Sequence, residues 1–401
     1  MRGCQAFGDT SANARLPHAA GHRAKSMTQA HHDLGLRFLV EPASFELSAE
    51  EARQLSVLRP AGIMLRKRNF RQDAGYEEWL GLYAKLVRDV REAIGRERII
   101  VSVDHEGGQV HRFPPPITRF PYPAFYGAEI AAVQAVAAAM GEELRSLGIN
   151  VSFSPTADIH SNPSNPVINQ RAFGTSAGQV SEAAKAFASR LRLAGITPCA
   201  KHFPGHGDTS ADSHVGLPSV GRTLAELEAR EFVPFRALIS DGIEMVMSAH
   251  IVLAQVAPGV TATLSPEIMT GILRGSLGFA GVTVADALGM AGVAAGGRPE
   301  KLAVRAHRAG IDLMLVAGDN VCIADALRLK GTLEQLRDSD PAAERGLQEA
   351  EQRVAALLNS LKQYPVSALS EQSLAVHRKL ALQLGKNVQW AHFDFNPVGF
   401  T

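Results

Sequence analysis

The sequence predicts a single (β/α)₈ barrel of the TIM type, because strand-like and helix-like segments alternate through most of its 401 residues. Eight short apolar or β-branched runs recur along the chain, and amphipathic stretches of helical period lie between them. This alternation is typical of parallel βαβ units, and eight units in about 300 residues fit a closed barrel better than an open sheet. Polar residues follow most of the runs, as a ring of active-site loops requires.

The eight predicted strands are short and rich in β-branched residues, and some irregularity is expected in the first of them. They cover residues 36–40, 61–65, 98–104, 149–153, 195–200, 243–249, 281–285 and 311–316. The helices predicted between them cover residues 76–94, 131–147, 181–193, 224–239 and 301–309. An open doubly wound sheet is the alternative, but no GxGxxG motif follows the first strand.

Three regions are predicted along the chain. Residues 1–33 are polar and lack the apolar core of a signal peptide, so we expect a disordered leader. Residues 34–340 are expected to form the catalytic barrel. The stretch 324–363 has a helical pattern with a Ser-Asp-Pro break at 339–341, and we expect residues 341–401 to be a C-terminal helix and tail packed on the barrel.

Charge and cysteine content exclude several classes of partner. Lys and Arg number 41 against 40 Asp and Glu, so no positive excess points to nucleic acid or to an anionic membrane. Cys4, Cys199 and Cys322 are an odd, widely spaced set without a CxxC pair, which indicates a reducing compartment and no disulfide framework. No apolar run approaches the roughly 20 residues that span a bilayer. We expect a cytoplasmic monomer that binds a small molecule and needs neither cofactor nor metal.

Residues 201–218 (KHFPGHGDTSADSHVGLP) concentrate the titratable side chains of the sequence. The stretch starts where the fifth predicted strand ends and contains three histidines, two aspartates and a lysine. Gly205, Gly207 and Gly216 permit backbone angles and close approaches that other residues resist. A solvated histidine-rich loop is the simpler interpretation. The polar residues at the other strand ends favour an active site instead.

The carboxyl ends of parallel strands meet at one mouth of a barrel, so residues far apart in sequence converge there. Mixed acidic and basic side chains at one mouth suit a neutral, hydroxyl-rich ligand bound by charge-assisted hydrogen bonds, such as a sugar. The convergent residues are Asp104, Arg112, Asp158, Asn169, Arg171, Lys201, His202, His250 and Asp286.

Four segments resemble the motifs of glycoside hydrolase family 3, in its β-N-acetylglucosaminidase branch. They are KHFPGHGDT at 201–209 with Asp212-Ser-His214, VDHEGG at 103–108 with Arg112-Phe113, NQRAFG at 169–174, and ADALGM at 285–290. The resemblance implies retaining hydrolysis in a barrel. It also implies a substrate: cell-wall muropeptides with a terminal β-linked N-acetylglucosamine, cleaved in the cytoplasm during recycling.

The resemblance further implies the roles of single residues. A retaining glycosidase needs a nucleophilic carboxylate and a second group that protonates the leaving oxygen and then activates water. The branch assigns Asp286 as nucleophile and His214 as acid/base, and Asp212 would orient the His214 ring. It assigns sugar binding to Asp104, Arg112, Arg171, Lys201 and His202. From local sequence alone, Asp286 could equally cap a helix and His214 could be an exposed loop residue.

Some features depart from the family pattern, and other functions stay open. Glu41-Pro42 follows the first strand where the family more often has an aspartate, and the basic Arg66-Lys-Arg-Asn69 after the second strand points to a different leaving-group side. A metal-dependent amidohydrolase is one alternative, with ligands among His202, His206, Asp208, Asp212 and His214. The others are a non-catalytic sugar-binding barrel, a β-glucosidase and a phosphorolytic variant.

Overall fold

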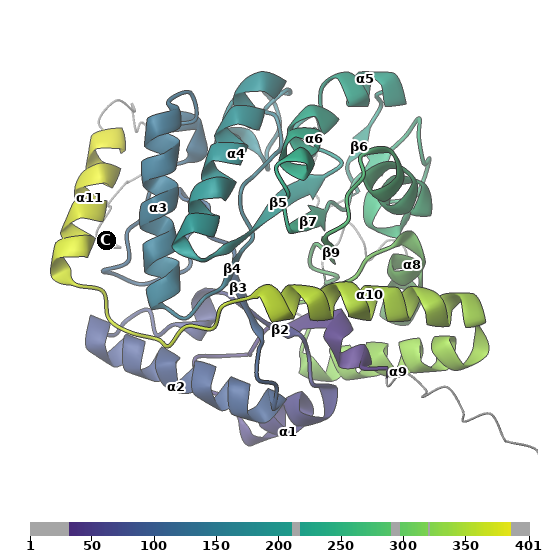
Figure 1. Cartoon of the computed structure of the whole chain (residues 1–401), viewed down its shortest axis with the longest axis horizontal. Coiled ribbons are helices and arrows are strands. Elements are labelled where there is room, and N and C mark those ends of the chain that lie inside the picture. Colours follow the sequence, from purple (N-terminus) through teal and green to yellow (C-terminus); the bar gives the residue numbers. More distant parts are fainter. Residues whose placement is uncertain (1–31, 211–216, 290–296, 320, 386–401) are drawn as a thin grey trace, which may run out of the picture. The chain divides into compact units, whose positions relative to one another are not determined.

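The computed structural model describes residues 32–210, 217–289, 297–319 and 321–385 (Figure 1). Within them, parallel strands form an eight-stranded sheet in the order β10-β1-β2-β3-β4-β5-β7-β9. A parallel bridge joins Val284 of the last strand to Leu313, one residue before β10, so the two edges meet and the predicted (β/α)₈ barrel is confirmed. The strands are β1 (Phe38–Val40), β2 (Gly62–Leu65), β3 (Ile100–Val103), β4 (Val151–Ser152), β5 (Thr197–Phe203), β7 (Met245–Ser248), β9 (Val282–Ala285) and β10 (Met314–Val316); β6 (Ser219–Val220) pairs separately with β8 (Val252–Leu253).

The helices begin and end at sequence signals. The Ser48 hydroxyl and the Glu51 carboxylate form a reciprocal capping box at the start of α1, and Gly95 ends α2 with a positive φ of 64°. The helices are α1 (Ala49–Leu58), α2 (Tyr76–Ile94), α3 (Ile130–Ser146), α4 (Ala177–Ala194), α5 (Leu224–Ala229), α6 (Phe232–Ser240), α8 (Pro299–Ala309), α9 (Ile323–Ser339), α10 (Pro341–Ser360) and α11 (Glu371–Gly385), with a π-helical segment at Glu267–Ser276.

The structure departs from the predicted elements in three places. The helix predicted at 224–239 is divided into α5 and α6, because Pro234 has no N–H to bond to the carbonyl of Arg230, and Arg230 leaves helical geometry. Strand β5 continues to Phe203 instead of ending at residue 200, and the register shift of the sheet falls between β5 and β7. The elements α1, α11 and Glu267–Ser276 were not predicted.

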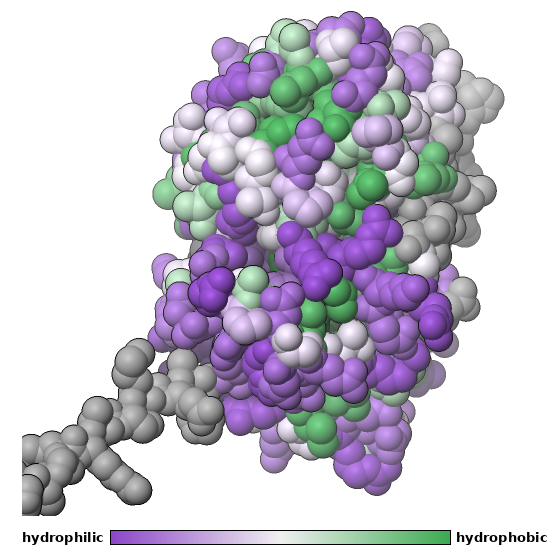
Figure 2. All heavy atoms as spheres, turned by 90° about the vertical axis from the view of Figure 1, so that its right-hand side faces the viewer, coloured by the Kyte–Doolittle hydropathy of each residue, from purple (hydrophilic) through white to green (hydrophobic). Residues whose placement is uncertain are grey.

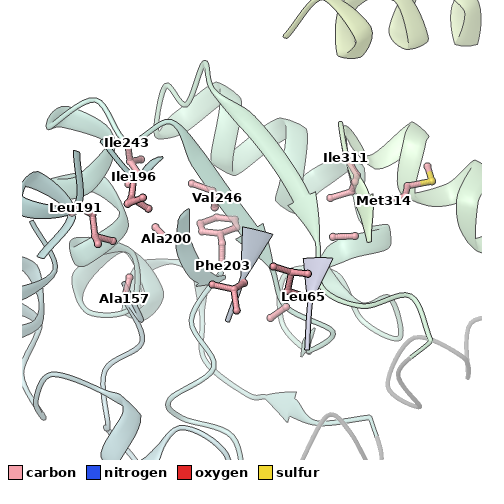
Figure 3. Packing of buried hydrophobic residues seen from close by; sticks show 14 of the residues in the cluster. Leu65, Ala157, Leu191, Ile196, Ala200, Phe203, Ile243, Val246, Ile311 and Met314 are labelled. Atoms are coloured by element: carbon pink, nitrogen blue, oxygen red, sulfur yellow. The ribbon is translucent and has the colours of Figure 1, made fainter. Parts of the chain in front are cut away.

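Alternate residues of each strand face opposite sides of the barrel wall, as the period of two requires. Ile100, Cys199 and Val284 belong to the cluster that fills the barrel interior. Their neighbours Val101 and Ala200 belong to the larger cluster between the sheet and the surrounding helices. Figure 3 shows this outer layer around β5, where Ala200, Phe203 and Val246 pack with Leu191 and Ile196.

Helix α10 lies across the amino-terminal end of the barrel (Figure 1). Its buried face adds Val354, Leu357 and Leu358 to the interior cluster. Asp312, fully buried before β10, accepts hydrogen bonds from Arg274 of the π-helical segment at 2.6 Å and from Arg353 of α10 at 3.0 Å. These apolar and ionic contacts close the amino-terminal end of the barrel, opposite the carboxyl ends of the strands.

The remaining helices are amphipathic. On the face that Figure 2 shows, hydrophilic side chains cover most of the lower part and hydrophobic side chains form smaller areas above it.

Helix α11 packs on α3, and the His377 ring contacts the buried carboxylate of Glu143 at 2.9 Å. None of the described helices is long and apolar enough to cross a membrane.

Candidate active site

Three acidic or basic residues at strand ends share the inward orientation of the barrel interior. Asp104, Lys201 and Asp286 each stand an even number of residues after an interior residue, namely Ile100, Cys199 and Val284. Continued alternation therefore aims their side chains at the carboxyl end of the barrel lumen. This placement follows from the strand pattern, since the three residues lie on β5 and directly after β3 and β9.

Lys201 stands at the centre of an ion-pair network. Its Nζ lies 2.6 Å from Oδ1 of Asp104 and 2.5 Å from Oε1 of Glu106, while its side chain is 2% exposed. Burial alone would lower the pKa of Lys201, but the two carboxylates raise it above its usual range. Burial acts in the opposite sense on Asp104, and the charges of Lys201 and Arg112 hold its pKa below normal. Lys201 and Asp104 are therefore both ionised at neutral pH.

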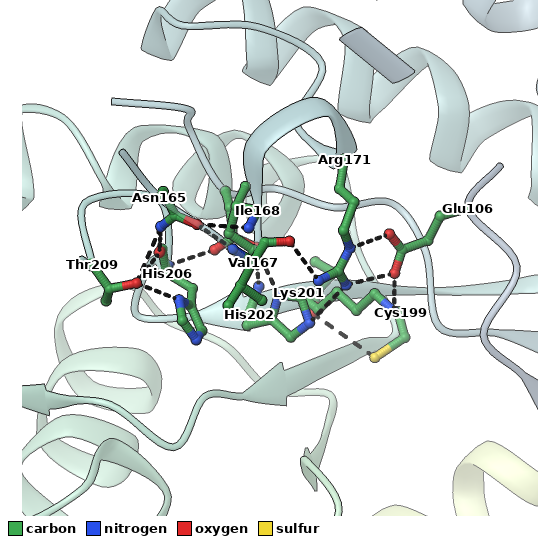
Figure 4. A network of polar contacts seen from close by, with 12 residues as sticks. Glu106, Asn165, Val167, Ile168, Arg171, Cys199, Lys201, His202, His206 and Thr209 are labelled. Atoms are coloured by element: carbon green, nitrogen blue, oxygen red, sulfur yellow. Dashed lines mark hydrogen bonds and ion pairs between the residues drawn. The ribbon is translucent and has the colours of Figure 1, made fainter. Parts of the chain in front are cut away.

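Glu106 is bound in parallel by the guanidinium of Arg171 (Figure 4). Arg171 donates from Nε to Oε2 at 2.8 Å and from Nη2 to Oε1 at 2.9 Å. Burial would raise the pKa of Glu106, yet Arg171 and Lys201 together hold it well below its usual range. In the sequence, Glu106 is recognisable only as part of the VDHEGG segment. Its pairing was missed because the EGG motif shows its presence and not the direction of its side chain.

Asp158 organises the backbone at the end of β5. Its fully buried carboxylate accepts from the backbone N–H of His202 at 3.1 Å and of His206 at 2.6 Å, and it contacts His202 Nδ1 at 2.7 Å. With a proton on Nδ1, His202 Nε2 faces Arg171 Nη2 at 3.4 Å as an acceptor. Asp158 thus fixes the ring of His202 and the turn that follows it. The sequence placed Asp158 at a strand end without revealing this role.

Arg112 connects this network to the solvent. Its Nη2 lies 3.4 Å from Oδ2 of Asp104, and its side chain is 24% exposed. Its Nε is buried and has no hydrogen-bond partner within the described part of the chain. A donor left in this state at the mouth of a barrel can bind an acceptor oxygen of a ligand.

Asp286 follows β9 directly. Its backbone N–H donates to the carbonyl of Ser248 at 3.3 Å, and its Oδ1 accepts from the N–H of Ala287 at 2.8 Å. The carbonyl of Ala287 lies 3.2 Å from Nε2 of His250, which follows β7. The end of β7 thus holds Asp286 directly through Ser248 and the following Ala287 through His250. Among the described residues, Asp286 and Lys201 form no direct hydrogen bond or ion pair, although both side chains point into the same lumen.

The other sequence candidates divide into described and undescribed residues. Asp212 and His214 lie outside the described residues. Asp208 pairs with Arg222 at 2.8 Å and with Arg230 at 3.1 Å. His206 contacts the Thr209 hydroxyl at 2.9 Å through Nδ1, and burial lowers its pKa to about 4. Asp208 and His206 are therefore engaged in holding the loop.

A metal site needs several ligand side chains that converge on one point. Nowhere along 32–210, 217–289, 297–319 or 321–385 do three or more His, Cys, Asp or Glu residues group as metal ligands. Within the metal-ligand set considered from the sequence, His202 is committed to Asp158 and Asp208 to arginines. The carboxylates of Asp104 and Glu106 at the mouth are paired with Lys201 and Arg171.

Comparisons with known proteins agree with this arrangement. Residues 30–357 match the family described as glycosyl hydrolase family 3 N terminal domain. A β-hexosaminidase of Methylococcus capsulatus is 38% identical over 287 residues, which cover 70% of this chain and 82% of that protein. A β-hexosaminidase of Neisseria meningitidis serogroup C is 36% identical over 288 residues, covering 69% and 77%.

Solved structures show the same likeness. The structure of NagZ from Neisseria gonorrhoeae in complex with N-trifluoroacetyl-D-glucosamine has a TM-score of 0.70 at 32% identity, over 87% of this chain and 98% of that one. A family 3 β-N-acetylglucosaminidase from Paenibacillus sp. str. FPU-7 has a TM-score of 0.78 at 29% identity, over 87% and 67%.

Proposed function

This chain belongs to glycosyl hydrolase family 3 and is a β-N-acetylhexosaminidase, and we propose that it releases terminal N-acetylglucosamine from cell-wall muropeptides. The proposal assigns it an exo-acting, retaining mechanism in the cytoplasm. The observation that carries it is the buried network of Lys201 with Asp104 and Glu106, which lies at the same end of the barrel as Asp286. A closed set of paired charges beside a carboxylate suits a neutral sugar.

The sugar would be bound by side chains whose positions are already fixed by ion pairs and hydrogen bonds within the protein. Lys201 and Arg112 offer N–H groups and Asp104 offers carboxylate oxygens, so hydroxyl groups can both accept and donate there. His202 and Arg171 extend the same wall, with His202 fixed by Asp158. These five residues, Asp104, Arg112, Arg171, Lys201 and His202, form the proposed sugar-binding set.

In the proposed reaction, the carboxylate of Asp286 attacks the anomeric carbon and forms a glycosyl-aspartate ester. The glycosidic bond breaks, and His214 gives a proton to the departing oxygen. His214 then takes a proton from water, whose oxygen attacks the anomeric carbon and releases Asp286. Asp212 would accept a hydrogen bond from the other ring nitrogen of His214 and favour its charged form.

The described residues support this choice of acid/base by engaging its substitutes. Glu106 stays ionised between Arg171 and Lys201, so it has no proton to give near neutral pH. His206 has a pKa lowered to about 4 by burial, and Asp208 is paired with two arginines. The engagement of these three groups supports the pair Asp212 and His214 as the groups that transfer the proton.

One set of assays tests the proposal. Purified protein should release the aryl group from an aryl N-acetyl-β-glucosaminide much faster than from the aryl β-glucoside, and should release N-acetylglucosamine from muropeptides. The first sugar product should be the β-anomer, and its yield should not depend on phosphate. Production of N-acetylglucosamine 1-phosphate in phosphate buffer would establish the phosphorolytic variant instead. Release of acetate in place of N-acetylglucosamine, lost after dialysis against a chelator and restored by metal, would favour the amidohydrolase.

A further inference from the structure

Asn165 lies in the loop after β4, shortly before Arg171 in the sequence, and is 2% exposed. Arg171 belongs to this loop, whereas Lys201 and His202 belong to β5. The proposed sugar-binding set is therefore divided between segments whose relative position has to be fixed. An uncharged residue such as Asn165 can do this only through hydrogen bonds, so its contacts were followed atom by atom.

The side-chain carbonyl of Asn165 holds the loop that carries Arg171 (Figure 4). Its Oδ1 accepts from the backbone N–H of Val167 at 2.9 Å and from that of Ile168 at 2.7 Å. Arg171 in turn donates from its backbone N–H to the carbonyl of Ile168 at 2.8 Å and from Nη1 to that of Val167 at 3.3 Å. The two residues that Asn165 fixes are thus the ones that Arg171 contacts in its own loop.

The amide nitrogen of Asn165 holds the loop after β5. Because Oδ1 accepts two N–H groups, the other atom of the amide is the donor Nδ2. It donates to the carbonyl of His206 at 2.8 Å and to the hydroxyl of Thr209 at 3.1 Å. The amide therefore accepts twice from one loop and donates twice to the other, which uses its full hydrogen-bonding capacity.

The two loops also approach each other closely through their backbones. A Cβ atom at Gly207 would lie 1.6 Å from the carbonyl oxygen of Ile159, so a side chain there would collide with it. The backbone N–H of Asn162 donates to the carbonyl of Gly207 at 3.3 Å, and its Nδ2 donates to that of Thr209 at 3.1 Å. A displacement of one loop would therefore carry the other with it.

An Asx turn is the simpler interpretation of Asn165, because asparagine often binds the backbone of its own loop. This interpretation accounts for Val167 and Ile168, which follow Asn165 within three residues. It does not account for His206 and Thr209, which lie 41 and 44 residues away in the sequence. The contacts of Nδ2 are long-range and join two segments of the site.

We propose that Asn165 is a positioning residue, which sets Arg171 against His202 by joining the loop after β4 to the loop after β5. This inference rests on the proposed function, since Arg171 and His202 belong to the proposed sugar-binding set. Nη2 of Arg171 lies 3.4 Å from Nε2 of His202, at the junction of the two segments. Asn165 acts on the sugar through the direction of the Arg171 guanidinium and does not touch the sugar itself.

A change of one side-chain group separates the two halves of the amide. Asn165→Asp keeps the acceptor that holds the Arg171 loop, but it replaces the donor with an oxygen that faces the carbonyl of His206. A displacement of about 1 Å can cost about 10²-fold in rate, so kcat/KM for an aryl N-acetyl-β-glucosaminide should fall about 10- to 100-fold. Asn165→Ala loses all four contacts and should lose at least as much activity. Asn359→Asp, at an exposed position of α10, makes the same exchange and should keep the wild-type kcat/KM.

A double-mutant cycle tests whether the loss passes through Arg171. Arg171→Lys keeps the positive charge beside Glu106 but not the geometry of the guanidinium. In the Arg171→Lys background, Asn165→Asp should lower kcat/KM by less than about threefold, because there is no guanidinium left to position. In an Arg112→Lys background, the full loss should persist, because Asn165 has no contact with the loop that carries Arg112 among its four hydrogen bonds.

The outcomes separate this inference from the proposed function. Wild-type kcat/KM in both Asn165 variants, or equal losses in the two backgrounds, would make Asn165 a structural residue and overturn the inference, while cleavage by the wild type upholds the function. An Arg171→Lys variant with wild-type kcat/KM would overturn it as well, because the direction of Arg171 would then not matter. Failure of the wild type to cleave the aryl N-acetyl-β-glucosaminide overturns the function itself. If circular dichroism shows that Asn165→Asp does not fold, Asn165→Ala takes its place in the cycle.

Discussion

Arg171 binds Glu106 through two parallel hydrogen bonds of 2.8 and 2.9 Å, and Glu106 in turn holds the ammonium group of Lys201 at 2.5 Å. The side chain of Glu106 is 1% exposed, so it does not present its oxygens to solvent. Its contribution is to set the direction of two cations. The donor geometry offered to a ligand therefore depends on a carboxylate that lies behind it.

Replacement of Glu106 by Gln should destabilise the protein strongly. The change leaves Arg171 and Lys201 buried with one carboxylate fewer, and breaking a buried ion pair typically costs about 3–5 kcal/mol. Urea denaturation should show this loss in the free energy of unfolding. Glu182→Gln, at an exposed position of α4, removes the same charge and should cost less than about 0.5 kcal/mol. Equal stabilities of the two variants would contradict the structural role of Glu106.

Asp286→Asn should abolish turnover of every substrate. The amide is isosteric but is no nucleophile, so the loss should not depend on how readily the aglycone departs. We expect kcat to fall on the order of 10⁴-fold or more for both a nitrophenyl glycoside and a disaccharide. A stopped assay of N-acetylglucosamine release measures it. If the variant retained a tenth of the wild-type rate on either substrate, another residue would be the nucleophile.

His214→Ala should discriminate between leaving groups. A nitrophenolate needs little protonation, whereas a sugar alkoxide needs the proton that general acid catalysis supplies, worth about 10²–10⁴-fold. The variant should therefore lose far more activity on the disaccharide than on the nitrophenyl glycoside, and Asp212→Ala should follow the same pattern more mildly. Rates of the glycosylation step on both substrates provide the measurement. Equal losses on both would make His214 a binding or structural residue.

The contact of α11 with α3 should weaken as pH rises. Burial alone would lower the pKa of His377, but Glu143 and then Glu142 raise it above 6.5, so the folded protein binds this proton more tightly. The stabilisation is complete below pH 6.5 and is lost as pH rises through the folded pKa. Burial also raises the pKa of Glu143, so its deprotonation acts in the same direction.

Unfolding free energies measured from pH 6 to 9 test this dependence. The wild type should lose stability across this interval, and His377→Gln should show a smaller loss because its side chain does not titrate. Glu143→Gln removes the carboxylate that raises the pKa and should shift the loss to lower pH. A His377→Gln profile parallel to that of the wild type would show that the pair does not couple to folding.

Sequence pattern was sufficient for the barrel and for the strand ends, because periodicity and the order of elements are local properties. It was insufficient where the outcome depends on side-chain partners. Asp158 and Glu106 stood at predicted strand ends, but nothing in the sequence shows that one binds the backbone of β5 and the other Arg171. The break of the predicted helix at Arg230 is a different case, because Pro234, four residues later, is a local signal for it in the sequence.

Two helices were missed for a different reason. Helix α1 has only Leu55 and Leu58 buried, so its apolar stripe is too sparse to detect, although its Ser48 and Glu51 capping box is a start signal. In α11 the buried residues are Leu374, His377, Ala381 and Gly385, of which Leu374 is the large apolar one. Weak stripes of this kind are stabilised by the surface they pack on.

The closure of the barrel floor by α10 decides where the polypeptide can be shortened. A fragment ending at residue 340 would keep every strand and the site-forming loops, yet it would lack Leu357, Leu358 and Leu361 of the interior cluster. Removal of one such leucine alone typically costs about 2–5 kcal/mol. The shortened chain would expose the apolar interior cluster at the amino-terminal end of the barrel, and we expect it to aggregate during expression. For recombinant work, we expect the smallest independent folding unit to extend through residue 363 at least, since Gln363 also donates a hydrogen bond to the carbonyl of Ile99, directly before β3.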